Sequence, residues 1–160
     1  MTLDLDPETV YGIREMASRS RATVFMVLFT AFNILLSRYS GQDDIVVGIP
    51  VAGRRHPDTL DLIGMFVSTL AVRSNPSWDK SFEAYLAEVR EDLIESYENQ
   101  DYPMERLVEK VCPTRDVSRN PLFDTCFVLQ NMDVSLMSAE NLQFTTRIID
   151  TGTTKFDVTF

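Results

Sequence analysis

Apolar residues are concentrated in two neighbouring stretches of the chain. From about Thr23 to Tyr39 nearly every face of a helix would be apolar, which is typical of a helix surrounded by protein on most sides. The β-branched run at 45–51 lies between Gly41 and Gly53 and predicts an interior strand covered on both faces. A buried helix that leads into a buried strand indicates an α/β layer structure. The apolar run is shorter than the ~20 residues that a helix needs to cross a bilayer, so we do not interpret it as a membrane span.

The remaining pattern predicts further helices and strands. Asp6 and Pro7 are typical of a helix start, and Val10, Ile13 and Ala17 share one face of the helix that begins there. The other predicted helices span 82–98, with Ser81 as its cap, and 103–111, and a short helical turn is predicted at 58–62. The predicted strands span 65–73, 122–130, 142–149 and 155–160. The fold class is therefore α/β, a mixed sheet flanked by helices.

Composition and charge narrow the classes of function. The 160 residues suffice for one domain with a core and are too few for most two-domain enzymes. A net charge of −9 would repel a phosphate backbone or an anionic membrane, so we expect no nucleic acid and no membrane as partners. The N-terminus lacks the features of a signal peptide. Cys112 and Cys126 are typical of free thiols in a cytosolic protein, so we expect a cytoplasmic location.

The residue inventory contains no self-sufficient active site. Nucleophilic catalysis of the Ser-His-Asp or Cys-His type needs an imidazole, and the only histidine is His56, which we interpret as a solvated turn residue. We interpret Cys112 and Cys126 as inert packing residues. The pair Arg54-Arg55 is read as a solvated basic turn rather than a phosphate site. The carboxylates are scattered, and no metal-ligand spacing appears.

Three segments together resemble one family. Residues 63–73 read IGMFVSTLAVR, residues 99–105 read NQDYPME and residues 115–123 read RDVSRNPLF. In this order and spacing they resemble motifs of the condensation domains of non-ribosomal peptide synthetases, and 40–48 and 150–157 are similar to connecting segments of that family. This chain departs from the family pattern at Ser68, Asn99 and Met104, where the family has Asn, His and Phe.

The resemblance implies one lobe of a chloramphenicol-acetyltransferase-like, two-lobed fold with a reaction tunnel between the lobes. Residues 1–160 would be a single partial domain, the beginning and middle of the C-terminal lobe, and the abrupt end of the last strand at Phe160 also suggests a piece of something longer. The family joins two substrates carried on phosphopantetheine arms, forming a peptide bond. Its His-His-x-x-x-Asp-Gly motif belongs to the other lobe and His56 does not match it, so we expect this piece to be inactive alone.

The resemblance also implies partners. They are the N-terminal lobe of the same domain, donor and acceptor carrier proteins, and an adjacent adenylation domain. We expect no cofactor or metal bound directly, only the phosphopantetheine arms of the carriers. Apolar surface meant for absent segments should be bare, so we also expect self-association.

Ser68 and Asn131 are the candidates for the tunnel wall. The strand pattern places Ser68 with Phe66, Leu70 and Val72 on one face. Its hydroxyl suits a wall passed by a pantetheine chain, and it equally suits a satisfied core position.

The other candidates are structural or contact the other lobe. Asp101 precedes the helix at 103–111, where a carboxylate accepts unpaired N–H groups. Arg115, Asp116, Arg119 and Asn120 form a polar loop, which we interpret as a hydrogen-bonded lock rather than a substrate contact. The alternatives to a catalytic lobe are a non-catalytic module of the same fold that binds a carrier protein or acyl-thioester, and a stand-alone acyltransferase.

Overall fold

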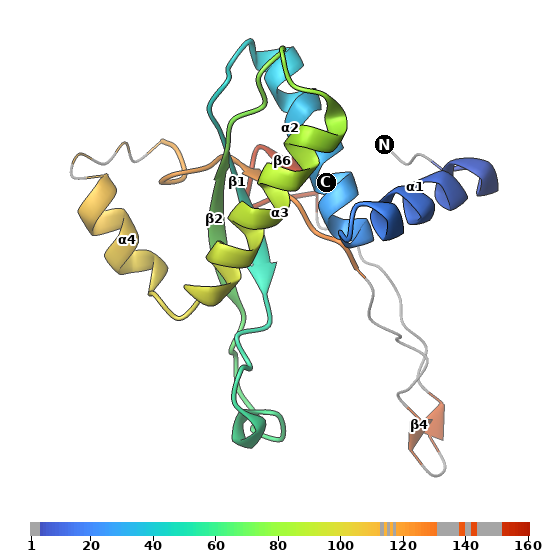
Figure 1. Cartoon of the computed structure of the whole chain (residues 1–160). Coiled ribbons are helices and arrows are strands. Elements are labelled where there is room, and N and C mark those ends of the chain that lie inside the picture. Colours follow the sequence, from blue (N-terminus) through green and yellow to red (C-terminus); the bar gives the residue numbers. More distant parts are fainter. Residues whose placement is uncertain are drawn as a thin grey trace.

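A four-stranded mixed sheet with two helices on one side holds the core of the protein (Figure 1). The structure is a computed structural model, and it describes residues 4–112, 114, 116, 118–130, 138–139, 142–143 and 152–160. The helices in these residues are α1 Pro7–Arg19, α2 Val24–Ser40, α3 Phe82–Glu98 and α4 Met104–Val111, with a 3₁₀ helix at Pro57–Thr59. The strands are β1 Ile45–Val51, β2 Ser68–Ser74, β3 Thr125–Cys126, β4 Ser138–Ala139, β5 Leu142–Gln143 and β6 Val158–Thr159.

Local signals set the ends of the helices, and the caps predicted at Asp6 and Ser81 are confirmed. The side-chain oxygens of Asp6, Thr23 and Ser81 accept backbone N–H groups of the first turns of α1, α2 and α3 at 2.8, 3.2 and 3.2 Å. Gly41 ends α2 with a φ of 69°, a left-handed conformation that glycine adopts without strain. Among the described residues no single helix is long and apolar enough to cross a bilayer; α1 and α2 meet that test only as a pair bent by 106°.

The sheet combines one antiparallel and two parallel pairings, in the order β2-β1-β3-β6. β1 and β2 are antiparallel over their whole length, from Ile45 opposite Ser74 to Val51 opposite Ser68. β3 pairs with β1 in parallel at Gly48, and β6 pairs with β3 in parallel. β4 and β5 form a separate antiparallel pair. The mixed sheet flanked by helices confirms the predicted fold class.

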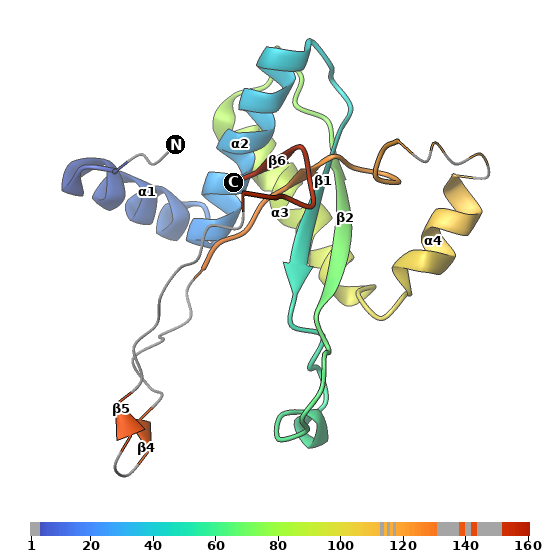
Figure 2. The same ribbon diagram turned by 180° about the vertical axis from the view of Figure 1, so that it is seen from behind.

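The core lies between the sheet and the pair α2 and α3. Alternate residues of the two long strands face it, and Val47 and Val72 are fully buried. Phe127, immediately after β3, joins the sheet to α2, because its ring centroid lies 5.6 Å from that of Phe29 and 5.2 Å from that of Phe32. Figure 2 shows α4 apart from this core, beyond β2.

The strand predicted at 65–73 begins three residues later in the structure. β2 begins at Ser68, and Met65 and Val67 are 92% and 61% exposed in a loop. Its partner β1 ends at Val51, and Gly53 then turns the chain away with a φ of 64°, so residues before Ser68 have no strand to pair with. The helical turn predicted at 58–62 also differs, because the 3₁₀ helix spans Pro57–Thr59.

The predicted strands near the C-terminus are shorter than expected. Only Thr125–Cys126 of the run 122–130 and Val158–Thr159 of the run 155–160 are strands. Of the run 142–149 the structure describes Leu142–Gln143. The alternation of apolar and polar residues within one segment does not show where its partner strand ends. In the run 122–130, Leu122 also has a φ of 71°, which is incompatible with an extended strand, and β3 begins only after it.

The expectation that strand 45–51 is covered on both faces was wrong. Ile45, Val47 and Ile49 are buried, whereas Val46 is half-buried and Pro50 is exposed. We call the side of the sheet away from α2 and α3 the outer face. Phe123 lies on this face, against Gly48 of β1.

Candidate functional site

Ser68, the first tunnel candidate, lies at the start of β2. It is half-buried and shares its strand face with the buried Leu70 and Val72, which confirms the predicted alternation. Its hydroxyl therefore stands where the core ends and the exposed loop 52–67 begins. Asn131, the second tunnel candidate, lies outside the described residues.

Asp101 makes a contact that differs from the predicted one. The N-cap of α4 is Pro103, with no side-chain hydrogen bond, so the prediction that Asp101 caps this helix was wrong. Instead the guanidinium of Arg55 donates to Asp101 Oδ2 at 2.7 Å and to the Glu98 carbonyl at 3.3 Å. The pair ties the loop 52–67 to the connection between α3 and α4.

The polar segment 116–124 carries three of the predicted residues. Asp116 Oδ1 accepts bonds from the Ser118 N–H at 2.9 Å and the Ser118 hydroxyl at 2.6 Å, and these bonds lower the pKa of Asp116. Arg119 binds Asp124, with Nε 3.1 Å from Oδ2. The Asn120 amide donates to the Lys155 carbonyl at 3.1 Å.

These contacts are those of a hydrogen-bonded loop. Each of them joins Asp116, Arg119 or Asn120 to another residue of this chain, and the role of the loop as a lock stays a prediction. Arg115, the fourth residue of the predicted lock, lies outside the described residues.

Phe123 anchors this segment on the outer face of the sheet. Its ring covers Gly48 of β1, where an added Cβ would fall 2.2 Å from Phe123 Cε2. The side chain is 8% exposed, and its ring centroid lies 5.7 Å from that of Phe156. Our reading of the sequence missed this contact, although a glycine inside a strand is a signal of close approach by another group.

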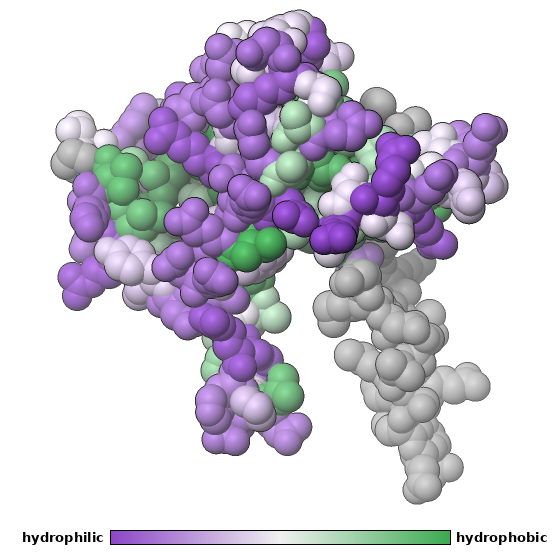
Figure 3. Space-filling model, in the orientation of Figure 1, coloured by the Kyte–Doolittle hydropathy of each residue, from purple (hydrophilic) through white to green (hydrophobic). Residues whose placement is uncertain are grey.

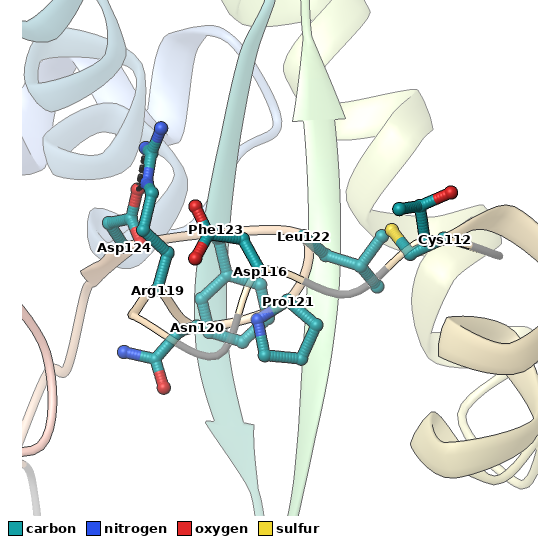
Figure 4. A pocket seen from close by; sticks show the side chains of 9 residues that line it. Cys112, Asp116, Arg119, Asn120, Pro121, Leu122, Phe123 and Asp124 are labelled. Carbon is teal, nitrogen blue, oxygen red and sulfur yellow. Dashed lines mark hydrogen bonds and ion pairs between the residues drawn. The ribbon is translucent and has the colours of Figure 1, made fainter.

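An open pocket of about 550 Å³ lies beside Phe123 (Figure 4). Its lining side chains are those of Cys112, Thr114, Asp116, Arg119, Asn120, Pro121, Leu122, Phe123 and Asp124. Figure 4 shows Leu122 extending toward Cys112 at the end of α4, with the Arg119–Asp124 pair at the opposite side. The lining of the pocket thus combines apolar side chains with polar and charged ones, which suits a ligand with both characters.

A second hollow, of about 430 Å³, lies between β2, the end of α3 and α4. Thr69, Ala71 and Arg73 of β2 line it. At its edge Arg73 binds Asp44 through two bonds of 2.7 Å, which lower the pKa of Asp44. Asp92 of α3 also lines it, and burial, together with nearby glutamates, raises the pKa of Asp92.

His56 and Cys126 have the predicted surroundings, whereas Cys112 lines the pocket beside Phe123. His56 is exposed, and its Nδ1 accepts the Asp58 N–H at 3.3 Å. Cys126 is buried, and burial raises the pKa of its thiol, which disfavours the reactive thiolate. Cys112 is half-buried in the pocket lining.

Arg54 was predicted to be solvated, and that prediction was wrong. It is half-buried and donates to backbone carbonyls of its own loop, including Gly64 O at 3.2 Å, while its guanidinium carbon lies 4.2 Å from the Phe66 ring centroid. The sequence Arg54-Arg55 in a polar turn does not predict these contacts, because Gly64 and Phe66 lie about ten residues further along the chain.

Among the described residues, large apolar side chains are exposed in the loop 52–67, on α4 and at several other positions. In the loop 52–67, Ile63 and Met65 are 105% and 92% exposed. Figure 3 shows apolar surface over α4 and at the tip of this loop. Val111 of α4 is 56% exposed.

Known proteins are similar to this chain in sequence and in fold. The family model of the condensation domain matches residues 1–160. Bacitracin synthase 1 of Bacillus licheniformis is 48% identical over 159 residues, which are 99% of this chain and 3% of that protein. Tyrocidine synthase 3 of Brevibacillus parabrevis is 46% identical over 159 residues, 99% of this chain and 2% of that protein. The chain therefore spans only a few hundredths of the length of these relatives.

Solved structures give the same assignment. A four-domain nonribosomal peptide synthetase bound to AMP and glycine superposes with a TM-score of 0.79 at 28% identity, over 81% of this chain and 10% of that one. The condensation domain of the monacolin K polyketide synthase superposes with a TM-score of 0.71 at 25% identity, over 78% of this chain and 29% of that one. The fold is that of the chloramphenicol-acetyltransferase-like condensation domains. The match over every residue, together with these structures, shows that the chain belongs to the condensation-domain family of the non-ribosomal peptide synthetases.

Proposed function

We propose that this chain is part of a domain that forms a peptide bond between two substrates held on carrier proteins. The amine on the acceptor phosphopantetheine arm attacks the thioester carbonyl on the donor arm. A C–N bond forms, the C–S bond breaks, and the donor arm leaves as a thiol that takes up the proton lost by the amine. The observation that carries this proposal is the family match over residues 1–160, joined to relatives that are peptide synthases.

We further propose that residues 1–160 are the beginning and middle of the C-terminal lobe, as a single partial domain. The chain aligns with 29% of the monacolin K condensation-domain structure, which supports less than a whole domain. The partly bare outer face of the sheet supports this view, because Pro50 is exposed there. The N-terminal lobe, two carrier proteins and an adenylation domain are the proposed partners, in the cytoplasm. In this arrangement Ser68 and Asn131 are tunnel-wall residues, and Asp101, Arg115, Asp116, Arg119 and Asn120 support the lobe.

The fragment is inactive alone in this proposal. Deprotonating the attacking amine calls for a general base that works near neutral pH, a role most often filled by the imidazole of histidine. His56 is the only histidine in the sequence. It lies in an exposed turn, beside Asp58 rather than beside a nucleophile. The base is therefore supplied by the other lobe.

Two loaded carrier proteins and mass spectrometry of the carriers test this proposal. The complete condensation domain is expected to yield a dipeptidyl carrier, and the 160-residue chain alone is expected to yield none. Product from the chain alone would overturn the inactivity, and absence of product from the complete domain would overturn the reaction.

The alternative is a non-catalytic module that binds a carrier or an acyl-thioester. It is compatible with the exposure of His56, the only histidine in the sequence, because such a module needs no catalytic base. It predicts that the complete domain binds an acylated carrier and releases it unchanged.

A further inference from the structure

The loop 52–67 keeps a defined shape although it projects away from the core. Figure 1 shows it extending beyond the ends of β1 and β2. Leu60, Ile63 and Met65 are 63%, 105% and 92% exposed, so burial of these side chains does not hold the loop together. Ordering such a segment costs conformational entropy, and other contacts must offset that cost.

Arg54, near the start of the loop, supplies these contacts. Its Nη1 donates to the carbonyls of Thr59 and Leu60, the latter at 3.5 Å, and its Nη2 donates to the Gly64 carbonyl at 3.2 Å. The guanidinium carbon also lies 4.2 Å from the centroid of the Phe66 ring. The planar, forked guanidinium of Arg54 thus joins the 3₁₀ helix to the part of the loop that leads into β2. The single ammonium of a lysine cannot make all of these contacts.

The two arms of the loop also meet directly at its base. Gly53 has a φ of 64°, and a Cβ there would fall 2.0 Å from the Phe66 carbonyl oxygen. Phe66 is therefore fixed on both sides, by the backbone of Gly53 and by the guanidinium of Arg54. The chain enters β2 soon afterwards at Ser68, which pairs with Val51 of β1, so Phe66 holds the segment that leads directly into the first pair of the β1–β2 ladder.

We propose that Arg54 is a positioning residue for the condensation reaction, acting through Phe66 to place Ser68 and the start of β2. This inference rests on the proposed function, in which Ser68 belongs to the tunnel wall. Within the part of the chain that the structure describes, the hydrogen bonds and the ring contact of Arg54 lie in its own loop, so we expect it to affect turnover through geometry and not through contact with the reacting atoms. A displacement of the wall by about 1 Å is enough to lower a rate substantially, because alignment of the two arms is then lost.

Hydrogen exchange in the isolated chain tests the first half of the proposal. The amides of Thr59 and Leu60 bond to the His56 and Pro57 carbonyls at 2.9 and 3.0 Å. In Arg54→Gln their exchange is expected to rise about tenfold or more, because the 3₁₀ helix loses its tie to the rest of the loop. Arg54→Lys should behave as Arg54→Gln, whereas Phe66→Tyr, which keeps the ring, should behave as wild type. Unchanged exchange in Arg54→Gln would overturn the proposal.

Steady-state kinetics in the complete synthetase test the second half. Arg54→Gln is expected to lower kcat roughly tenfold with little change in KM for either loaded carrier. Arg54→Lys should not restore kcat, and Phe66→Tyr should retain it. Arg14→Gln, which removes an exposed arginine on α1, is the charge-matched control and should leave both parameters unchanged.

The two proposals fail in different ways. Equal kcat in wild type and Arg54→Gln, with dipeptide formed by both, would overturn the role of Arg54 and leave the proposed function intact. A wild-type synthetase that forms no dipeptide would overturn the proposed function itself. A rise in KM with unchanged kcat would assign Arg54 to carrier binding and overturn the positioning role.

Discussion

The ring of Phe123 lies over the α-carbon of Gly48, so β1 has no room there for a side chain on the outer face of the sheet. The contact joins residues far apart in the sequence and brings the polar segment 116–124 onto the sheet. Since β3 begins at Thr125 and pairs with β1 at Gly48, the same contact places β3.

Gly48→Ala is therefore expected to destabilise the fold. The added Cβ would lie 2.2 Å from Phe123 Cε2, so the ring has to move, at a cost of about 1–3 kcal/mol in the free energy of unfolding. Urea denaturation monitored by circular dichroism measures the change. Gly12→Ala is the matched control, because nothing lies within 4 Å of a Cβ at that helical position, and it should stabilise by about 0.5–1 kcal/mol. Equal effects of the two substitutions would contradict the contact.

The buried hydrogen bond between Tyr85 and Ser74 gives a second prediction. The Tyr85 hydroxyl and Ser74 Oγ are 3.0 Å apart, and the two residues are 2% and 3% exposed. Tyr85→Phe leaves the serine without this partner and should cost about 1–3 kcal/mol in urea denaturation. The double variant Tyr85→Phe/Ser74→Ala should recover part of the loss, and Tyr11→Phe, at a residue 70% exposed, should be neutral. A double variant with strictly additive losses would argue against coupling.

Alkaline pH should weaken the fold through the same tyrosine. Burial raises the pKa of Tyr85 from its ordinary value of 10.0 to about 12. The unfolded chain thus loses the proton first, so the contribution of this residue to stability is complete below pH 10 and falls as the pH rises from 10 toward 12. Comparing wild type with Tyr85→Phe in urea between about pH 9 and pH 11 isolates this contribution. A stability gap between the two proteins that stays constant over this range would refute the shift.

The exposed loop gives a prediction about association. Ile63 and Met65 are almost completely accessible, and apolar surface of this kind drives contact between molecules. Sedimentation velocity of the isolated chain should show self-association that increases with concentration. Ile63→Ser with Met65→Ser should raise the monomer fraction, whereas a polar substitution at the buried Ile49 would report unfolding instead. A wild-type chain that stays monomeric at high concentration would falsify the expectation.

Local chemistry explains what the sequence predicts well. The apolar run begins at the capping residue Thr23 and ends just before Gly41, so the predicted range from about Thr23 to Tyr39 lies within one residue of each end of α2. Ser81 and the apolar spacing through Leu86, Val89 and Leu93 do the same for α3. In these elements every signal lies within a few residues of its effect.

Contacts between distant residues explain the features that the sequence did not predict. Asp101 lies where a capping carboxylate is expected, yet its carboxylate accepts a hydrogen bond from the guanidinium of Arg55 instead. The length of β2 depends on where β1 ends and on the turn at Gly53, which the alternation in the β2 segment does not encode. Charge and alternation describe each segment by itself, whereas these outcomes depend on which segment lies beside it.

The parallel pairing of β1 with β3 and of β3 with β6 has a consequence for how the chain folds during synthesis. The β1–β2 pair and its two helices come from neighbouring residues, so they are able to assemble while the ribosome is still translating the C-terminal third of the chain. β3 joins β1 only after Thr125 has emerged, and β6 waits for Val158. Closing such long loops slows folding, so half of the sheet is completed late, and until then an unpaired edge of β1 is open to capture by other nascent chains.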